Sequence, residues 1–357
     1  MTGVLTASEV NAAAGLGVRN SQPEGIGRVV ALSGLLCWNN LGRNVVFADH
    51  QARPRAVFGT TLFPGQDEPS QYDLDVHAII DLPELGLVGV LNHIGLLRGF
   101  RRGDINGSPA ARLIEPARQW WFVADVERTV AASGRLVGSA PRSDGGVGLL
   151  VSAPLSAVAD DGTIGTNLCA AAFGEVTGLG AVLAAEGPMI AVGGDGVVAL
   201  LPMHGDRLGA PKWEVTVGFR VATVVYHEGS VWVAGPDRGK VDDYDWEQLR
   251  GGGFSVLATA DGHEVASGPL PDGVAWGTGG VAVAPLGRWL VTAGRTGRLL
   301  LVSPPTGDRL PETRPLATRS LGIAHMAVVG HRVFSGFNRG GYRLFSCAQL
   351  APDMEGR

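Results

Sequence analysis

Arginine and histidine side chains recur at two kinds of position in this chain, and both kinds suit the binding of an anion. One is the start of the first strand of a repeated unit, and the other is the turn between its second and third strands. A guanidinium binds a carboxylate or phosphate through two parallel hydrogen bonds. We therefore predict a locally positive face, in a chain of net charge −5, for an anionic ligand or an acidic partner segment. The candidates are Arg28, His77, Arg128, Arg220 and His325 at strand starts, and His93, Arg238, Arg295 and Arg339 at turns.

Two interpretations compete for these side chains. Three of the histidines, His77, His93 and His325, could converge as ligands of a divalent metal, since neutral imidazole is a common metal ligand. Each could instead bond to nearby backbone, and the arginines could simply be hydrated. No cofactor is predicted, and a divalent metal is the alternative. The same turns also carry Asn39, Asn40, Asn92, Arg142, Asp237 and Asn338.

One turn is longer than its counterparts and contains aromatic residues. Between Gly235 and Gly253 the chain reads PDRGKVDDYDWEQLRGG, which places Tyr244 and Trp246 in an insertion. Aromatic residues and arginine anchor many protein interfaces, so this insertion is the first candidate for a partner contact. The chain lacks GxSxG, HExxH and P-loop motifs, and it has no GxGxxG between a strand and a helix. No catalytic residue is therefore predicted.

The elements that position these residues repeat along the chain. The stretch Ala181–Leu208 reads as three short apolar runs separated by glycine turns, which predicts an antiparallel meander. Its first turn glycine recurs about every 49 residues, within the range of four-stranded propeller blades. Because one such meander cannot bury both its faces, we predict an all-β fold, a seven-bladed β-propeller, with a two-sheet sandwich as the alternative. The marker glycines are Gly34, Gly86, Gly134, Gly187, Gly229, Gly287 and Gly330.

The turns also carry a family resemblance. The segments Ser303–Leu310, Ala258–Val265 and Met203–Leu208 resemble the third turn of quinoprotein-like repeats, in which a charged residue follows a Thr/Asp-Gly turn. The whole chain resembles seven-bladed WD40-like and quinoprotein-like propellers. It departs from WD40 repeats because no strand ends in Trp-Asp, and from quinone-dependent dehydrogenases because it has no adjacent cysteine pair. The resemblance implies a fold and transfers no catalytic residue.

The predicted organisation is a single propeller over 25–349, an N-terminal segment 1–24 and a C-terminal tail 350–357. Thr2–Thr6 is predicted to close the ring by pairing with the last blade, or Ser8 caps a short helix instead. The tail of the second blade, Arg101–Glu127, is expected to include a short helix near Ala110–Leu113. Trp120 and Trp121, adjacent on its outer strand, should point to opposite faces.

The composition of the chain indicates which classes of partner and which cellular compartment to expect. The chain has 54 glycines, 18% charged residues and no basic run, which argues against nucleic acid as a partner. No apolar run is long enough to span a membrane, and no secretory signal is visible. Three cysteines without metal-type spacing, Cys37, Cys169 and Cys347, are expected to be buried in a reducing compartment. These features predict a cytoplasmic protein.

The expected function is a non-catalytic scaffold or accessory subunit that presents its loop-rich face to a protein partner. The alternative is a hydrolase or lyase that acts, with or without a metal, on a small anionic or lactone-like molecule in the central channel. A third, weaker option is a quinone-binding relative that has lost its redox role.

Overall fold

In the computed structural model, the described residues form strands, short helices and some of the connections between them. The chain divides into two compact units. The first unit consists of Met1–Phe122, Asp160–Gly162 and Arg319–Arg357. The second unit consists of Val123–Ala159 and Thr163–Thr318. The described residues are 26–40, 44–59, 76–92, 94–107, 110–122, 128–141, 147–169, 182–238, 252–270, 283–286, 289–293, 299–302, 313–317, 323–329, 332–337 and 342–346.

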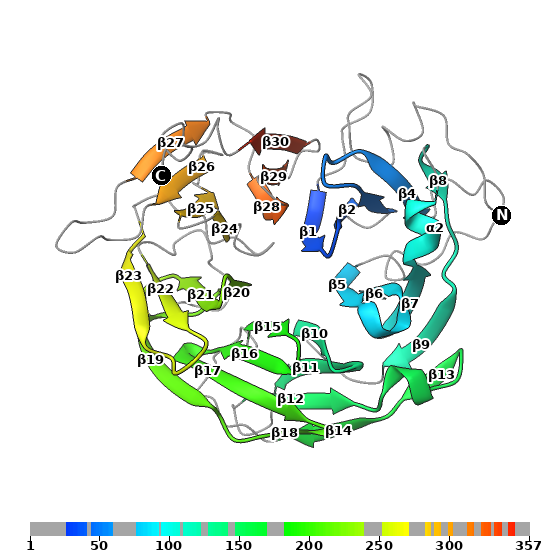
Figure 1. The fold of residues 1–357 in the computed structure, drawn as a ribbon, viewed down its shortest axis with the longest axis horizontal. Helices are drawn as coiled ribbons and strands as arrows, with labels where there is room; N and C mark the ends of the chain where they lie inside the picture. Colours follow the sequence, from blue (N-terminus) through cyan, green and yellow to red (C-terminus); the bar gives the residue numbers. More distant parts are fainter. Residues whose placement is uncertain are drawn as a thin grey trace. The chain divides into compact units, whose positions relative to one another are not determined.

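The first unit contains three sheets (Figure 1). Most neighbouring strands in them are consecutive in the chain, and β8 instead joins β4 across three intervening strands. All their pairings are antiparallel except β4 with β8, which is parallel. The first sheet comprises β1 (Ile26–Leu32), β2 (Leu35–Asn40), β3 (Asn44–Ala48), β4 (Pro54–Gly59) and β8 (Arg112–Leu113). The second comprises β5 (Val76–Leu82), β6 (Leu87–Asn92), β7 (Leu96–Arg101) and β9 (Arg118–Phe122). The short strand β13 (Gly162–Ile164) spans the division between the two units. The third comprises β28 (Ile323–Val329), β29 (Arg332–Phe337) and β30 (Tyr342–Ser346).

The second unit contains four antiparallel sheets among its described residues. The first has β10 (Arg128–Ala132), β11 (Arg135–Pro141), β12 (Val147–Ser152) and β14 (Thr166–Cys169), with a short 3-10 helix η3 (Leu155–Ala157). The next has β15 (Val182–Glu186), β16 (Met189–Gly193), β17 (Asp195–His204), β18 (Arg207–Leu208) and β19 (Trp213–Arg220). The third has β20 (Thr223–His227), β21 (Ser230–Gly235), β22 (Gly253–Ala258) and β23 (Glu264–Pro269). The fourth has β24 (Val283–Leu286), β25 (Trp289–Ala293), β26 (Leu299–Val302) and β27 (Thr313–Ala317).

The predicted meander is confirmed at the turns. Gly34, Gly86, Gly134, Gly187 and Gly229, the first-turn glycines within the described residues, all have a positive φ between 56° and 76°. A tight hairpin needs this left-handed backbone, which glycine adopts without a steric penalty. The described residues are mostly strand, as an all-β fold requires.

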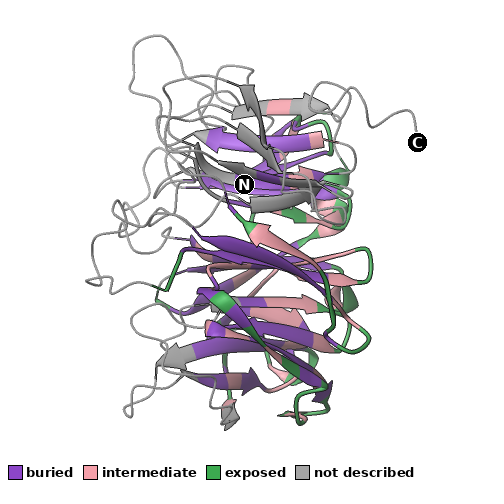
Figure 2. Ribbon diagram, turned by 90° about the vertical axis from the view of Figure 1, so that its left-hand side faces the viewer, coloured by how far each residue is buried: buried purple, intermediate pink, exposed green. Residues whose placement is uncertain are grey.

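Apolar side chains on facing sheets bury one another within each unit. In the first unit, Trp38 of β2 stacks on Phe334 of β29 with 5.1 Å between ring centroids, and Phe47 of β3 lies 5.2 Å from Phe100 of β7. In the second unit, a cluster that includes Val198 and Leu257 joins the sheets of β17 and β22. Figure 2 shows the buried residues concentrated in the strands and the exposed residues at turns.

Two local predictions can be compared with the structure. Trp120 is fully buried whereas Trp121 is 42% exposed, which confirms that the two side chains point to opposite faces. The helix near Ala110–Leu113 was wrongly placed, because the helix α2 spans Arg102–Asn106 and Arg112–Leu113 pairs with β4 instead. Ile105 fixes α2 by inserting its buried side chain into the core, a contact that a local pattern does not reveal.

Candidate functional site

Two of the predicted arginines, Arg220 and Arg238, meet at one carboxylate in the second unit. Asp195 begins β17, just after the turn from β16. Arg220 ends β19, and Arg238 follows β21. The three residues therefore come from the turn between two strands, from the connection into β20 and from the turn after β21. We call Asp195, Arg220 and Arg238 the Asp195 cluster.

Both guanidinium groups lie near the same oxygen atom. Arg220 Nε is 3.7 Å and Arg238 Nε is 3.6 Å from Asp195 Oδ1. Arg238 also donates a hydrogen bond through Nη2 to the backbone carbonyl of Asp195. The Arg220 side chain is nearly buried, with 12% exposed, whereas the Arg238 side chain is 44% exposed. Arg220 thus forms the floor of the cluster, and Arg238 forms its accessible rim.

Backbone hydrogen bonds hold the three connections together. The carbonyl of Gly194 accepts from the amides of Gly196, at 2.9 Å, and Val221, at 3.1 Å. The amide of Arg220 donates to the carbonyl of Pro236, at 2.9 Å. These bonds join the β16–β17 turn to the β19–β20 connection and to the segment after β21, so the arginines are placed by backbone geometry and not only by charge.

Glycine is required at Gly196 for two reasons. Its φ is +77°, and a Cβ there would overlap the Arg238 guanidinium. The sequence Gly-Asp-Gly at 194–196 therefore supplies both the tight turn and the room in which Arg238 lies over the backbone. A side chain at this position would displace Arg238 from Asp195.

Two guanidinium groups lie near the single carboxylate of Asp195. Asp195 Oδ1 is buried and accepts no hydrogen bond from the described part of the chain, so charge attraction alone links it to the arginines. An anionic group of a ligand or partner that approached the exposed side of Arg238 would find a cation only partly neutralised. The arrangement suits the binding of an anion.

The structure places the remaining predicted residues as follows. Arg28, Arg128 and His325 lie in β1, β10 and β28, where only the backbone is described, and the half-buried His77 lies in β5. Whether the histidines converge therefore stays a prediction. The residues outside the described part of the chain are His93, Tyr244, Trp246, Arg295 and Arg339.

No group of three His, Cys, Asp or Glu side chains that could hold a metal occurs in the described segments. Cys37 of β2 is fully buried, as expected for a small core residue. Burial raises the pKa of its thiol far above the ordinary value. Because the thiolate is the reactive form, Cys37 contributes packing and not nucleophilic chemistry.

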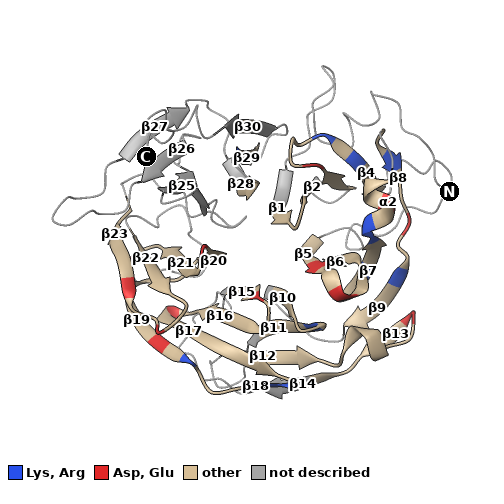
Figure 3. Cartoon of the chain, viewed as in Figure 1, with Lys and Arg blue, Asp and Glu red and all other residues tan. Residues whose placement is uncertain are grey.

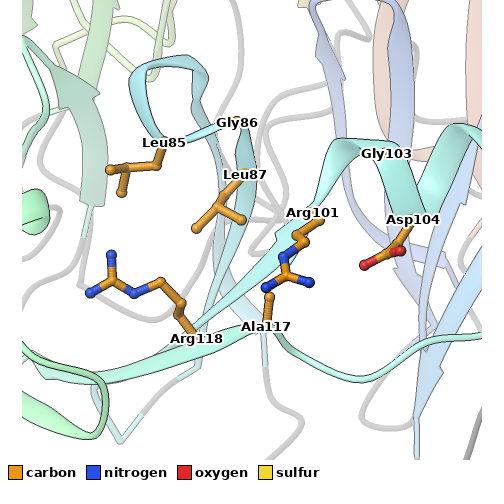
Figure 4. Close-up of a pocket in the computed structure, with 8 residues that line it drawn as sticks. All are labelled: Leu85, Gly86, Leu87, Arg101, Gly103, Asp104, Ala117 and Arg118. Atoms are coloured by element: carbon orange, nitrogen blue, oxygen red, sulfur yellow. The ribbon is translucent and has the colours of Figure 1, made fainter.

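A pocket that the sequence analysis missed lies in the first unit, at one end of the sheet β5–β9. It has a volume of about 390 Å³, and its walls include Leu85, Leu87, Arg101, Asp104, Ala117 and Arg118 (Figure 4). These residues come from the short 3-10 helix η2 (Pro83–Leu85), β6, β7, α2 and the start of β9. The only signal in the sequence is the concentration of arginines between Arg98 and Arg118, which fell in the segment whose helix was misplaced.

Comparison with known proteins gives a fold but no family. No protein-family model matches the chain, and no curated protein matches its sequence. The Cps50 (Swd1) β-propeller domain of Myceliophteria thermophila is 9% identical with a TM-score of 0.57, over 91% of this chain and 99% of that one. Hydrazine synthase of Kuenenia stuttgartiensis is 11% identical with a TM-score of 0.57, over 92% and 99%. The computationally designed protein Ika8 is 12% identical with a TM-score of 0.53, over 92% and 98%.

At these identities the likeness concerns the fold alone, and it supports a β-propeller. The number of blades and the superfamily stay predictions. Among the residues that the structure describes, no helix is sufficiently long and apolar to span a membrane.

Proposed function

We propose that this chain is a seven-bladed β-propeller of the WD40-like or quinoprotein-like kind, closed by its N-terminal segment, that binds a protein partner in the cytoplasm. On this proposal the protein is a scaffold or accessory subunit and catalyses no reaction. The partner-binding face is formed by the turns between second and third strands together with the connections between blades. The partner presents an acidic segment to that face.

The Asp195 cluster is the observation that carries this proposal. Its two arginines share one carboxylate, and Arg238 keeps 44% of its side chain exposed. An exposed guanidinium held in a fixed position binds a carboxylate with less loss of side-chain entropy than a mobile one. The chain continues from Arg238 directly into the predicted insertion with Tyr244 and Trp246. Along the chain, a fixed cation is thus followed within eight residues by two aromatic residues of the kind that anchors interfaces.

The structural neighbours neither select nor exclude this function. They include a β-propeller domain and an enzyme, hydrazine synthase, and one fold accommodates many functions. Binding is therefore inferred from the Asp195 cluster.

Capture of partners on immobilised protein tests the proposal. We expect Arg238→Glu to reduce capture of the partner at least about tenfold, because charge reversal repels an acidic segment. Deletion of Lys240–Arg250 should do the same without lowering the melting temperature. The matched control is Arg207→Glu, which makes the same charge change at an exposed residue of β18, beyond the opposite end of β17.

Quantitative mass spectrometry of the captured proteins gives the result. A protein retained by the wild type and Arg207→Glu but lost with Arg238→Glu and with the deletion supports the proposal. Equal capture by the wild type and Arg238→Glu contradicts it.

A further inference from the structure

We propose that the pocket at the end of the sheet β5–β9 binds a small amphipathic monocarboxylate, with Arg101 as the residue that binds the carboxylate group. This site lies in the first unit and involves none of the Asp195 cluster. It is independent of the proposed partner-binding face, and either proposal can fail without the other.

Figure 3 shows basic positions on α2 and β9 and an acidic position beside β13. Three of the arginines near the pocket pair with a carboxylate. Arg102 pairs with Asp81. Arg112 lies 3.5 Å from Asp104 through Nη2 and Oδ1. Arg118 pairs through Nε with Asp160. Each of these three carboxylates therefore has its own arginine.

Arg101 differs from these three arginines because it takes part in none of the three ion pairs. It is exposed at the end of β7, where its backbone pairs with Leu87, and within the described segments its side chain forms no hydrogen bond or ion pair. Glu84 of η2 is next to Leu85 along the chain but does not line the pocket. The countercharge of Arg101 is thus missing from the walls of the pocket, and an anionic ligand would supply it.

The second cation of the pocket is held in a fixed orientation. The Arg118 guanidinium carbon lies 4.7 Å from the centre of the buried Trp120 ring, and Asp160 anchors the side chain through Nε. Figure 4 shows the guanidinium groups of Arg101 and Arg118 on either side of Leu87. A carboxylate beside Arg101 would therefore also lie in the field of Arg118.

The walls between the two arginines are apolar and favour a ligand with a hydrocarbon part. Leu85, Leu87 and Ala117 line the pocket alongside the arginines. A volume of about 390 Å³ accommodates a small molecule but not a folded segment. Inorganic phosphate would leave the apolar walls uncovered, whereas a carboxylate with a short aliphatic chain covers them and satisfies Arg101 by a bidentate pair.

Isothermal titration calorimetry with sodium hexanoate tests the proposal on the full chain. We expect saturable binding with a dissociation constant of about 1 mM, as a ligand of this size allows. Hexanamide, acetate and inorganic phosphate should bind at least about tenfold more weakly, because each lacks either the charge or the hydrocarbon part. The carboxylate could belong to a free aliphatic acid, which hexanoate represents, or to the C-terminus of a polypeptide, which N-acetyl-leucine represents. Whichever of the two compounds binds more tightly identifies the source of the carboxylate.

Two variants locate the site. Arg101→Gln should weaken hexanoate binding at least about tenfold, because it removes the charge that no carboxylate neutralises. Ala117→Phe should do the same by filling the pocket, and if this variant fails to fold, Arg101→Gln decides alone. Arg207→Gln, which makes the same charge change in the other unit, should bind like the wild type.

No saturable binding of hexanoate or N-acetyl-leucine would overturn the proposal, and so would unchanged binding by Arg101→Gln. Binding of phosphate as tight as that of hexanoate would overturn the assignment to an amphipathic carboxylate. Loss of binding in Arg101→Gln with retention in Arg207→Gln would support it.

Discussion

Asp49 shows how a single carboxylate can organise a turn in the first unit. Its Oδ1 accepts hydrogen bonds from the amides of Gln51, at 2.8 Å, and Arg53, at 3.0 Å. Its Oδ2 accepts from Arg53 Nε, at 3.0 Å, and Arg55 Nη2, at 2.8 Å. Burial alone would raise the pKa of this carboxyl, but the two amides and two guanidinium groups outweigh it and lower the pKa below the ordinary value. The charged form therefore stabilises the folded turn.

The pH dependence of stability tests the role of Asp49. Because its pKa is lowered on folding, the stabilisation is fully present above the unfolded value of about 3.9 and is lost as the pH falls through the folded value. We expect Asp49→Asn to lower the free energy of unfolding by roughly 1–3 kcal/mol at pH 7. Urea unfolding should show this difference shrinking towards zero at acidic pH.

Asp160→Asn is the comparison for this measurement. The Asp160 side chain is 62% exposed and pairs with one arginine, so its loss should cost less than about 1 kcal/mol. A difference between wild type and Asp49→Asn that is the same at pH 7 and pH 3 would contradict the account of Asp49.

The residue scale also shows what the sequence could and could not predict about the sites. Arg220 and Arg238 were identified because each occupies a position that recurs in the repeat, Arg220 at a strand start and Arg238 at a turn, and both kinds of position were expected on one face. Arg101 was missed because its importance depends on which neighbours already have partners. Asp81, Asp104 and Asp160 each pair with another arginine and not with Arg101. These three carboxylates come from the end of a strand, a helix and a distant loop, so a local sequence pattern does not reveal their partners.

At the scale of the element, the turns are the part of the fold that the sequence predicts best. A two-residue turn requires a left-handed backbone, and glycine marks that requirement in the sequence itself. The helix α2 was misplaced because its position depends on tertiary packing. Ile105 is buried against the core and Gly107 closes the helix by donating to the carbonyl of Gly103. Five residues carry too short a pattern to predict such a helix.

A pair of turn variants separates backbone strain from displacement of Arg238. Gly187 and Gly196 have φ values of +56° and +77°, so alanine at either position meets the penalty for left-handed backbone, about 1–2 kcal/mol. A Cβ at Gly187 would meet nothing within 4 Å, whereas one at Gly196 would overlap the Arg238 guanidinium. We therefore expect Gly196→Ala to lower the free energy of unfolding more than Gly187→Ala does.

Partner capture provides a second readout for these variants. Gly196→Ala should weaken capture as Arg238→Glu does, and Gly187→Ala should leave it intact. Equal losses of stability, together with equal capture, would show that Arg238 is not held over Gly196.

At the scale of the whole molecule, the account depends on the period of the repeat. Within the described segments the strands form seven sheets, and the neighbouring structures support a β-propeller. The seven-bladed ring, its closure by Thr2–Thr6 and the division into 1–24, 25–349 and 350–357 come from the sequence alone. Closure would join residues far apart in the chain, and Thr2–Thr6 lies outside the described residues.

An experimental structure of the full chain, by crystallography or cryo-electron microscopy, tests this account most directly. We expect seven sheets arranged around one axis, with Thr2–Thr6 paired to β30 and with Arg220 and Arg238 on the same face as the insertion that contains Trp246. A different number of blades, or two bodies without a common axis, would contradict the seven-bladed ring and the partner-binding face built on it.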